Sequence, residues 1–152
     1  MHPRLNPQEL TPDLVSKARS VQLAIEALGL EKSLIELLKI RTSQINGCAY
    51  CLNMHTTDAR AHGETEARIY VLPAWRESTL YTPRERAALA WAESLTHISE
   101  RGAPDALYAD LKAHFTDMEI VAVTSAIAMM NFWNRMAVAF GTVHPNESAA
   151  AR

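Results

Sequence analysis

Residues 45–55 read Ile-Asn-Gly-Cys-Ala-Tyr-Cys-Leu-Asn-Met-His and contain both cysteines of the chain, Cys48 and Cys51. The Asn-Gly pair breaks the preceding helix, and we predict that Asn46 caps a new helix that carries both thiols and His55. At about 100° per residue, Cys51 lies about 60° around this helix from Cys48, and His55 lies about 20° from Cys48. Two thiols and an imidazole therefore share one helix face, an arrangement typical of redox chemistry.

Local chemistry favours a reactive thiol here without deciding which one attacks. A thiolate is the nucleophilic form of cysteine, and it forms at neutral pH beside a base or at a helix N-terminus. His55 follows Cys51 by four residues, so it is the base nearest to that sulfur. Cys48 is expected in the first turn of the helix, where unpaired N–H groups favour negative charge.

Three other uses of the cysteine pair fit the sequence less well. A structural disulfide across four residues closes too small a loop to restrain the unfolded chain much. Structural zinc takes four ligands, and the motif could recruit only His62 from the far end of the same helix. Covalent haem requires a His directly after the second Cys, where this chain has Leu52. We therefore expect neither a metal nor a cofactor.

The rest of the chain has helical periodicity, with start and stop signals between segments. Thr11 and Pro12 open a helix that runs to Gly29. Its apolar face consists of Leu14, Ala18, Val21, Ile25 and Leu28. Further helices are predicted over about 31–45, 46–63, 65–72 and 82–97, from Pro104, and over about 117–140. The fold class is all-α: a compact bundle of about six to seven helices, with the cysteine motif at the N-terminal end of a central helix.

The helix over 117–140 bears on assembly. Thr116 and Glu119 form a capping box before it, and Gly141 ends it. It is apolar on nearly every side, and a small bundle cannot cover such a helix completely. We therefore expect a homo-oligomer. Residues 1–152 form a single domain without internal repeats, with a loose tail after about residue 145.

Composition excludes several classes of partner. Fifteen Lys and Arg against seventeen Asp and Glu give a net charge of −2, which offers no electrostatic case for nucleic acid or an anionic membrane. The longest uncharged stretch, 120–134, is shorter than the ~20 residues that cross a bilayer. The N-terminus has no apolar core of the secretory type, so a cytoplasmic location is the expectation.

The motif resembles that of the alkylhydroperoxidase D (AhpD) superfamily, which includes the carboxymuconolactone decarboxylase-like proteins. In that family a Glu precedes the first Cys by twelve residues, two residues separate the cysteines, and a His follows the second Cys by four. Glu36, Cys48, Cys51 and His55 occupy these positions here. Chain length, helix succession and the segment 131–135 also resemble small single-domain members, so the similarity covers about residues 14–143.

The resemblance implies an AhpD-like fold, a trimer or hexamer, and a role for each motif residue. Cys51 would be the peroxidatic thiol with His55 as its base, Cys48 the resolving thiol and Glu36 a proton relay. The substrate would be an organic hydroperoxide or hydrogen peroxide, and a separate thiol reductant or reductase protein would reopen the disulfide. Better-characterised peroxidases of the family have His directly before the second Cys, where this chain has Tyr50. A phenol, with an ordinary pKa near ~10, does not shuttle protons at neutral pH as imidazole does.

Glu36 alone would pass for a surface charge, but Leu34, Ile35, Leu37 and Leu38 surround it in sequence. Partial burial would raise its pKa and suit it to proton transfer. An apolar pocket for an organic peroxide could be walled by Trp75, Trp91, Met129, Met130, Phe132 and Trp133, although such residues are more often core. His62, His97 and His114 have no partners at informative spacings and are expected at the surface or in the core.

The leading prediction is a thiol-dependent peroxidase in which the two cysteines cycle between dithiol and disulfide. A second hypothesis is a dithiol oxidoreductase without a peroxide step. A third hypothesis is a carboxymuconolactone decarboxylase-like lyase, but that chemistry does not need a cysteine pair. A fourth hypothesis is a non-catalytic, redox-sensing oligomer.

Overall fold

The computed structural model describes residues 3–145, and all regular structure in this range is helical, which confirms the predicted all-α class. The elements are α1 (Pro7–Leu10), α2 (Pro12–Glu26), α3 (Lys32–Asn46), α4 (Ala49–Ala61), α5 (Glu66–Val71), the 3₁₀ helix η1 (Leu72–Glu77), α6 (Pro83–Thr96), α7 (Ile98–Arg101), α8 (Asp105–His114) and α9 (Asp117–Phe140). The short elements α1, η1 and α7 were not predicted, because a single turn has too few residues to show a period. The tail expected after residue 145 lies outside the described residues.

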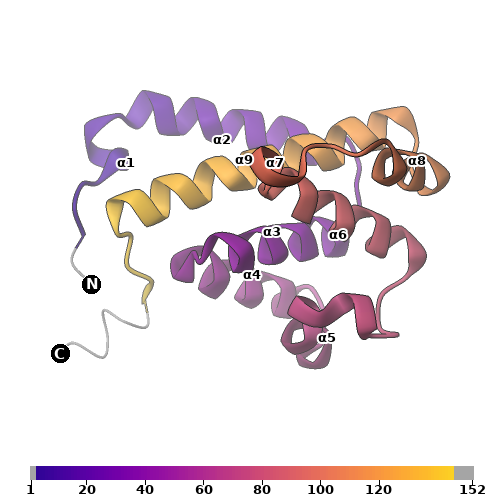
Figure 1. The fold of residues 1–152 in the computed structure, drawn as a ribbon. Coiled ribbons are helices and arrows are strands. Elements are labelled where there is room, and N and C mark those ends of the chain that lie inside the picture. Colours follow the sequence, from indigo (N-terminus) through magenta and orange to yellow (C-terminus); the bar gives the residue numbers. More distant parts are fainter. Residues whose placement is uncertain (1–2, 146–152) are drawn as a thin grey trace.

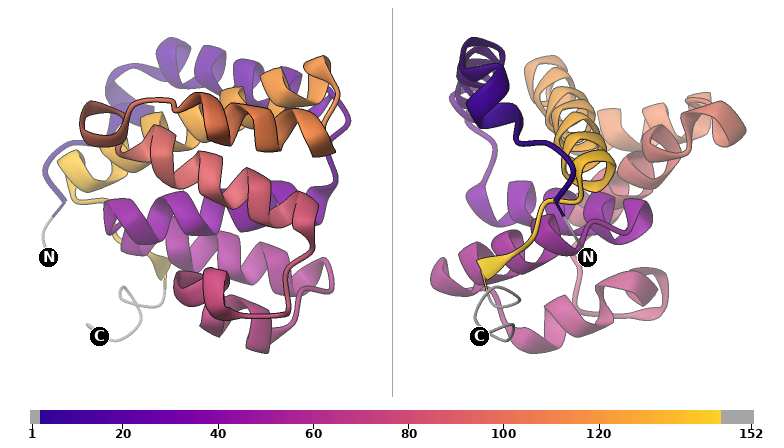
Figure 2. Two further views of the ribbon diagram at one scale, coloured as in Figure 1. Left: turned by 45° about the vertical axis from the view of Figure 1, so that its right-hand side comes forward. Right: turned by 90° about the vertical axis from the view of Figure 1, so that its left-hand side faces the viewer.

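The long C-terminal helix α9 is the element around which the others pack. It contacts α2, α3, α4, α6 and α8, and in Figure 1 it runs between α2 and α3. Figure 2 shows α3 lying between α6 and α4, with α5 beyond α4. This order places α3 at the centre of the molecule, with α4 and its cysteine motif packed against it.

Most helix boundaries follow the predicted signals. Thr82 and Thr116 cap α6 and α9, and in each case the Glu at the third helical position bonds back to the cap, so both capping boxes are formed. Gly141 ends α9 in the left-handed conformation, with φ 65°. Helix α2 is shorter than expected and ends at Glu26 rather than near Gly29.

Two apolar clusters make up most of the core. The first joins α3, α6, α8 and α9 through residues such as Leu34, Leu38, Leu111, Val123 and Ile127. The second joins α3 to α4, α5, η1 and α6 through residues such as Leu37, Ile40, Leu72, Trp75 and Leu89. A third, small cluster contains both cysteines and Met130. The thiol site is therefore built into the packing between α4 and α9.

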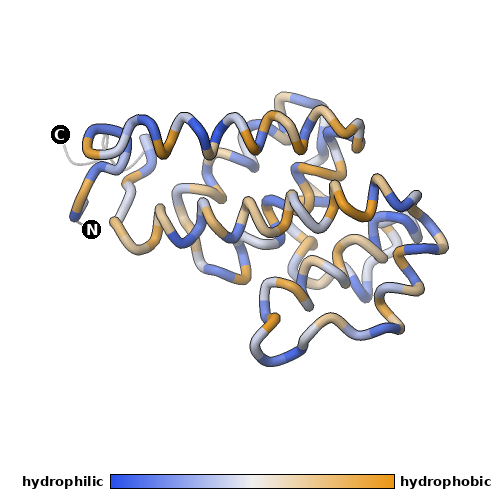
Figure 3. Tube along the Cα trace, turned by 90° about the horizontal axis from the view of Figure 1, so that it is seen from above, coloured by the Kyte–Doolittle hydropathy of each residue, from blue (hydrophilic) through white to orange (hydrophobic). Residues whose placement is uncertain are grey.

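Part of the apolar surface of α2 and α9 is left uncovered by the other residues of the range 3–145. On α2, Leu14 is 52% and Val21 54% exposed, although both belong to the predicted apolar face. On α9, Met118 and Val121 are also exposed. Figure 3 shows these two helices side by side, with α9 apolar along most of its length. Among residues 3–145, no helix has the length and apolar character needed to cross a membrane.

Candidate active site

The cysteine motif begins at the tight junction between α3 and α4. Gly47 ends α3 with a left-handed φ of 65°, which glycine adopts without steric cost. Cys48 follows as the N-cap residue of α4, and its Sγ accepts a hydrogen bond from the N–H of Cys51 at 3.3 Å. The prediction that Asn46 caps this helix is therefore wrong, because the turn at Gly47 moves the helix start two residues along the chain. Asn46 is the last residue of α3.

The two cysteines are joined by a disulfide, with their Cα atoms 5.3 Å apart. This separation lies in the ordinary range for disulfides. Cys48 is 1% and Cys51 2% exposed, and both pack against Met130 of α9. Tyr50 and Trp133 are partly buried and pack against the same group. The sulfur atoms are thus shielded from direct contact with a large molecule outside.

His55 and Glu36 are in direct contact. His55 lies one turn after Cys51 in α4 and is 5% exposed. Its Nδ1 lies 3.0 Å from Oε2 of Glu36, which comes from the adjacent helix α3. No water is needed between them. The packing of α3 against α4 brings together two residues that are nineteen positions apart in the sequence.

Lys39 is a site residue that the sequence analysis missed. Its Nζ lies 3.1 Å from Oε1 of Glu36 and 3.0 Å from Oε1 of Glu26, so one ammonium group bridges two carboxylates. The Lys39 side chain is only 12% exposed. A signal was present in the sequence, because Glu36 and Lys39 are three apart in α3, a spacing at which opposite charges on a helix can pair.

These contacts set the ionisation of Glu36. Burial alone would raise its pKa, but the hydrogen bond from His55 and the charge of Lys39 outweigh burial and hold the pKa below the ordinary value of 4.5. Our expectation of a raised pKa is therefore wrong, because it considered burial without these partners. Burial would also lower the pKa of Lys39, but Glu36 and Glu26 more than reverse this and raise it.

The charge on Glu36 also decides which nitrogen of His55 carries a proton. An ionised carboxylate only accepts hydrogen bonds, so Nδ1 of His55 must be the donor in this contact. In the neutral ring Nε2 is then the basic nitrogen. Of the two ring nitrogens, Nε2 is therefore the one that can accept a proton.

The hydrogen-bond chain continues beyond Lys39 to α9. Glu26 accepts a bond from Nε2 of Gln22 at 3.1 Å, and Oε1 of Gln22 accepts one from Nε1 of Trp133 at 2.7 Å. The Glu26 side chain is 34% exposed, so the chain meets solvent there. Helices α2, α3, α4 and α9 are therefore linked by one polar network that starts at His55.

A cavity of about 600 Å³ opens onto this network between α1, α2, α3, α4 and α9. Its wall is mainly apolar and includes four methionines: Met54, Met129, Met130 and Met136. Cys51, His55 and Tyr50 line it, whereas Cys48 does not. The volume is typical of sites for organic molecules of drug size. Only one sulfur of the pair thus faces the cavity.

The aromatic residues proposed for a pocket separate into two groups. Trp133, together with Met129 and Met130, lines the cavity as predicted. Phe132 lines a shallower groove on the outside of α2 and α9. Trp75 and Trp91 are core residues away from the cavity, which is the placement that we noted as the more frequent one for such residues. Periodicity alone could not tell the two faces of a helix apart when both are apolar.

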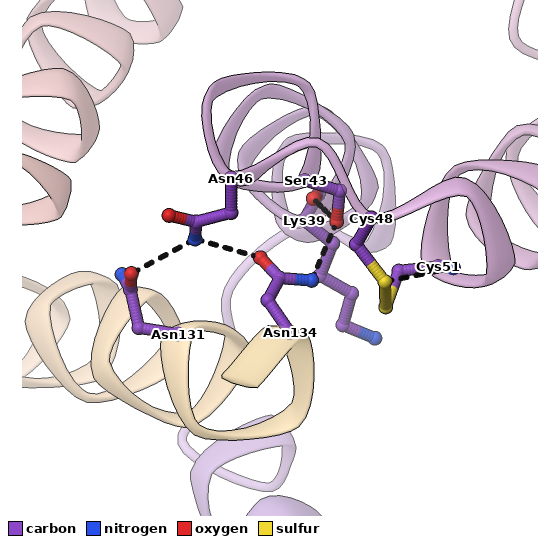
Figure 4. Close-up of a disulfide and its surroundings, with 7 residues drawn as sticks. All are labelled: Lys39, Ser43, Asn46, Cys48, Cys51, Asn131 and Asn134. Atoms are coloured by element: carbon purple, nitrogen blue, oxygen red, sulfur yellow. Dashed lines mark hydrogen bonds between the residues drawn. A yellow bond between two sulfur atoms is a disulfide. The ribbon is translucent and has the colours of Figure 1, made fainter. Parts of the chain in front are cut away.

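An amide cluster holds the end of α3 against α9. Nδ2 of Asn46 donates to Oδ1 of Asn131 at 3.0 Å and to Oδ1 of Asn134 at 2.9 Å, and Asn134 donates to Oγ of Ser43 at 3.1 Å. Figure 4 shows this cluster next to the disulfide, at the turn from which Cys48 leaves α3. Because buried amides must be hydrogen-bonded, the cluster fixes the register of α9 against the cysteine motif.

His62, His97 and His114 do not line the cavity. His62 is exposed at the end of α4 and bonds the carbonyl of Asp58, and His97 and His114 each have a side chain about one-third exposed. One group of possible metal ligands was found among the described residues: Glu36, His55 and the exposed Asp58 have ligand atoms within 4.8 Å of one another. However, Lys39 occupies the other oxygen of Glu36 and places a positive charge beside that position, which disfavours a cation.

Comparison with known proteins agrees with this geometry. The family model of the carboxymuconolactone decarboxylase family matches residues 13–94, more than half of the chain, including all four motif residues. The chain belongs to this family. The resemblance noted from the cysteine motif is thereby confirmed.

Two relatives match this member of the carboxymuconolactone decarboxylase family over nearly its whole length. It is 39% identical to the uncharacterised protein YdfG of Bacillus subtilis, over 93% of this chain and 96% of YdfG. A solved structure from Agrobacterium tumefaciens, described as a protein of unknown function and an antioxidant defence protein of the AhpD type, is 42% identical. Its TM-score is 0.92, over 95% of this chain and 99% of that one.

A third structure extends the comparison to larger proteins. The AhpD core of an uncharacterised peroxidase-related protein from Ralstonia eutropha is 25% identical, with a TM-score of 0.78, over 92% of this chain and 75% of that one. The family's AhpD-like fold is therefore shared by this chain.

Proposed function

We propose that this protein is a thiol-dependent peroxidase that reduces organic hydroperoxides. The observation that carries the proposal is that Cys51 and His55 line one apolar cavity, whereas Cys48 does not. A peroxide in this cavity could reach only one sulfur. The family membership and the AhpD-like relatives support the same reading.

The reaction begins with the reduced pair. Nε2 of His55 takes the proton of the Cys51 thiol, and the thiolate attacks one oxygen of the peroxide. The O–O bond breaks, the proton on His55 passes to the departing alkoxide, and an alcohol leaves. Cys51 is now a sulfenic acid.

The second cysteine completes the cycle. The sulfur of Cys48 attacks the sulfur of Cys51, a disulfide forms, and the hydroxyl group leaves as water with the thiol proton of Cys48. An external thiol reductant that reaches Cys51 through the cavity then returns two electrons and two protons. The disulfide of the structure corresponds to the state after this step.

Glu36 and Lys39 are assigned supporting roles. Glu36 holds the protonated Nδ1 of His55 and so keeps Nε2 basic, while Lys39 keeps Glu36 ionised. Tyr50 lines the cavity beside Cys51 and stands where better-characterised family peroxidases have His. We assign it no proton transfer, and its phenol remains a hydrogen-bond donor toward a bound peroxide.

The three alternative functions have less support than the peroxidase. A dithiol oxidoreductase acting on proteins would need an accessible sulfur, but Cys48 and Cys51 are 1% and 2% exposed. A lyase of the type in the family name has no need of the cysteine pair. A non-catalytic redox sensor has no need of a cavity of about 600 Å³ at the thiol.

Peroxide consumption with cumene hydroperoxide and a panel of thiol reductants tests the proposal. We expect turnover by the wild type and none by Cys51→Ser. Cys48→Ser should accumulate a sulfenic acid that dimedone labels, because the resolving thiol is gone. His55→Ala should slow oxidation by about 10² to 10⁴, and Glu36→Gln by less. Wild-type turnover equal to that of the double Cys→Ser variant would refute an enzymatic role.

We also propose a homo-oligomer, a trimer or hexamer by family resemblance. The exposed apolar residues Leu14, Val21, Met118 and Val121 on α2 and α9 support it, because a large uncovered apolar surface is unfavourable in a monomer. Light scattering gives the mass directly. We expect Val21→Glu to lower it, and a wild-type monomer at micromolar concentration would contradict the proposal.

A further inference from the structure

The cavity contains a charged group that the proposed peroxidase chemistry does not use. Arg19, on α2, lines the cavity together with Val15, Gln22 and Leu23. Its guanidinium makes no hydrogen bond or ion pair with any residue in the described range 3–145. The other charged side chains of the wall, Glu26 and Lys39, form an ion pair with each other.

The position of Arg19 relative to the thiol site follows from helix geometry. Arg19 precedes Glu26 by seven residues, so the two share one face of α2 and lie about 10 Å apart along its axis. Glu26 is the solvent end of the network that starts at His55. Arg19 therefore lies two helical turns away from the polar end of the cavity.

The part of the cavity near Arg19 and the part near Glu26 carry charges of opposite sign. The group of Glu26, Lys39 and Glu36 has two carboxylates to one ammonium and disfavours an anion nearby. Arg19, two turns away, favours one. The rest of the wall is mainly apolar and includes the methionines and Trp133. The cavity thus offers a cation, an apolar wall and a thiol.

We propose that the cavity binds an amphipathic carboxylic acid, with the carboxylate at Arg19 and the chain along the methionine wall toward Cys51. This inference rests on the proposed function for the identity of the reacting group, and it names the substrate class: a fatty-acid hydroperoxide rather than hydrogen peroxide. Arg19 is then the residue that selects a charged organic peroxide over a neutral one.

Binding to the disulfide form tests this without any turnover. Decanoate and decan-1-ol share an alkyl chain and differ in charge, and the fluorescence of Trp133, which lines the cavity, reports occupancy. We expect the wild type to bind decanoate about tenfold more tightly than decan-1-ol, as one charge-assisted contact at a partly solvated site allows. In Arg19→Gln this preference should fall to about one, and Arg19→Lys should keep most of it.

The matched control is Arg135→Gln, which removes an exposed arginine of α9 that does not line the cavity and should leave the preference for decanoate in place. Equal affinities for acid and alcohol in the wild type, or an unchanged preference in Arg19→Gln, would overturn the inference. A change of oligomeric mass in Arg19→Gln would also overturn it, by assigning the cation to a contact between copies. The binding assay contains no peroxide. Its outcome therefore does not depend on whether the protein has peroxidase activity.

Discussion

Replacement of Lys39 by methionine isolates the electrostatic part of the site. The change keeps the length of the side chain and removes the ammonium that lies 3.1 Å from Glu36 and 3.0 Å from Glu26. An opposite charge within this distance typically lowers a carboxyl pKa by about one to three units. Since burial of Glu36 acts in the other direction, we expect the pKa of Glu36 to be higher in Lys39→Met than in the wild type.

The consequence is a shift of the pH profile of thiol oxidation. In the wild type, Lys39 helps to hold the pKa of Glu36 below its ordinary value, so Glu36 stays ionised toward lower pH. In Lys39→Met, Glu36 becomes protonated at a higher pH and then no longer fixes the proton on Nδ1 of His55, so the acidic limb should move upward. Lys39→Arg should restore the wild-type profile, because it keeps the charge.

Stopped-flow oxidation of the reduced protein, over about pH 5 to 9 where imidazole and thiol groups titrate, measures this limb. Lys17→Met, an exposed lysine of α2 with no ion pair in the described residues, is the control. Unfolding in urea should show a loss of about 2 kcal/mol for Lys39→Met, because two carboxylates then face each other without their cation. An acidic limb that does not move in Lys39→Met would refute the assignment of Lys39 as the group that keeps Glu36 ionised.

Three further outcomes are expected. Tyr50→His should accelerate peroxide reduction by about tenfold, measured by stopped flow, if the missing imidazole limits the rate. Glu93→Gln should cost about 3 kcal/mol in urea unfolding, because Glu93 is 3% exposed and accepts bonds from Arg41 and Trp75. The pKa of Glu93 is lowered in the folded protein, so ionised Glu93 stabilises the fold above pH 4.5, and this stabilisation is lost as the pH falls through the lowered pKa. The difference in unfolding free energy between the wild type and Glu93→Gln should therefore shrink in acid. Gly47→Ala should lower the free energy of unfolding by about 1 kcal/mol, measured in thermal melts, because alanine is strained at the left-handed φ of this position. No atom lies within 4 Å of the added Cβ, so a steric clash does not contribute.

The site contains residues of the cysteine motif and other residues that only contact them in the folded protein. Cys51 and His55 were identified from their spacing on one helix and Glu36 from the family resemblance, and the structure places Glu36 and His55 3.0 Å apart. Lys39 and Glu26 have no fixed spacing to the cysteines, since their contact depends on how α2 crosses α3. A motif search therefore finds the reacting groups and misses those that set their ionisation.

The sequence by itself determined the helical class, most helix ends and the shared helix face of Cys51 and His55. These depend on local physics: hydrophobic period, capping residues such as Thr82 and Thr116, and the fixed 3.6-residue turn that puts Cys51 and His55 on one face. Local signals were wrong at Asn46, because a side chain that could cap a helix was taken instead by the amides of Asn131 and Asn134. Its partners lie 85 and 88 residues away, and no local rule contains them.

Tertiary structure alone decided the direction of the Glu36 pKa, the opening of Cys51 rather than Cys48 into the cavity, and the exposure of the apolar face of α2. Each of these properties depends on side chains from several helices. The pKa depends on a cation and an imidazole that approach Glu36 from its own helix and from α4, and the cavity exists only where five helices fail to fill a common space. Coulomb energy and packing depend on distance in space, and distance along the chain fixes that only within one helix.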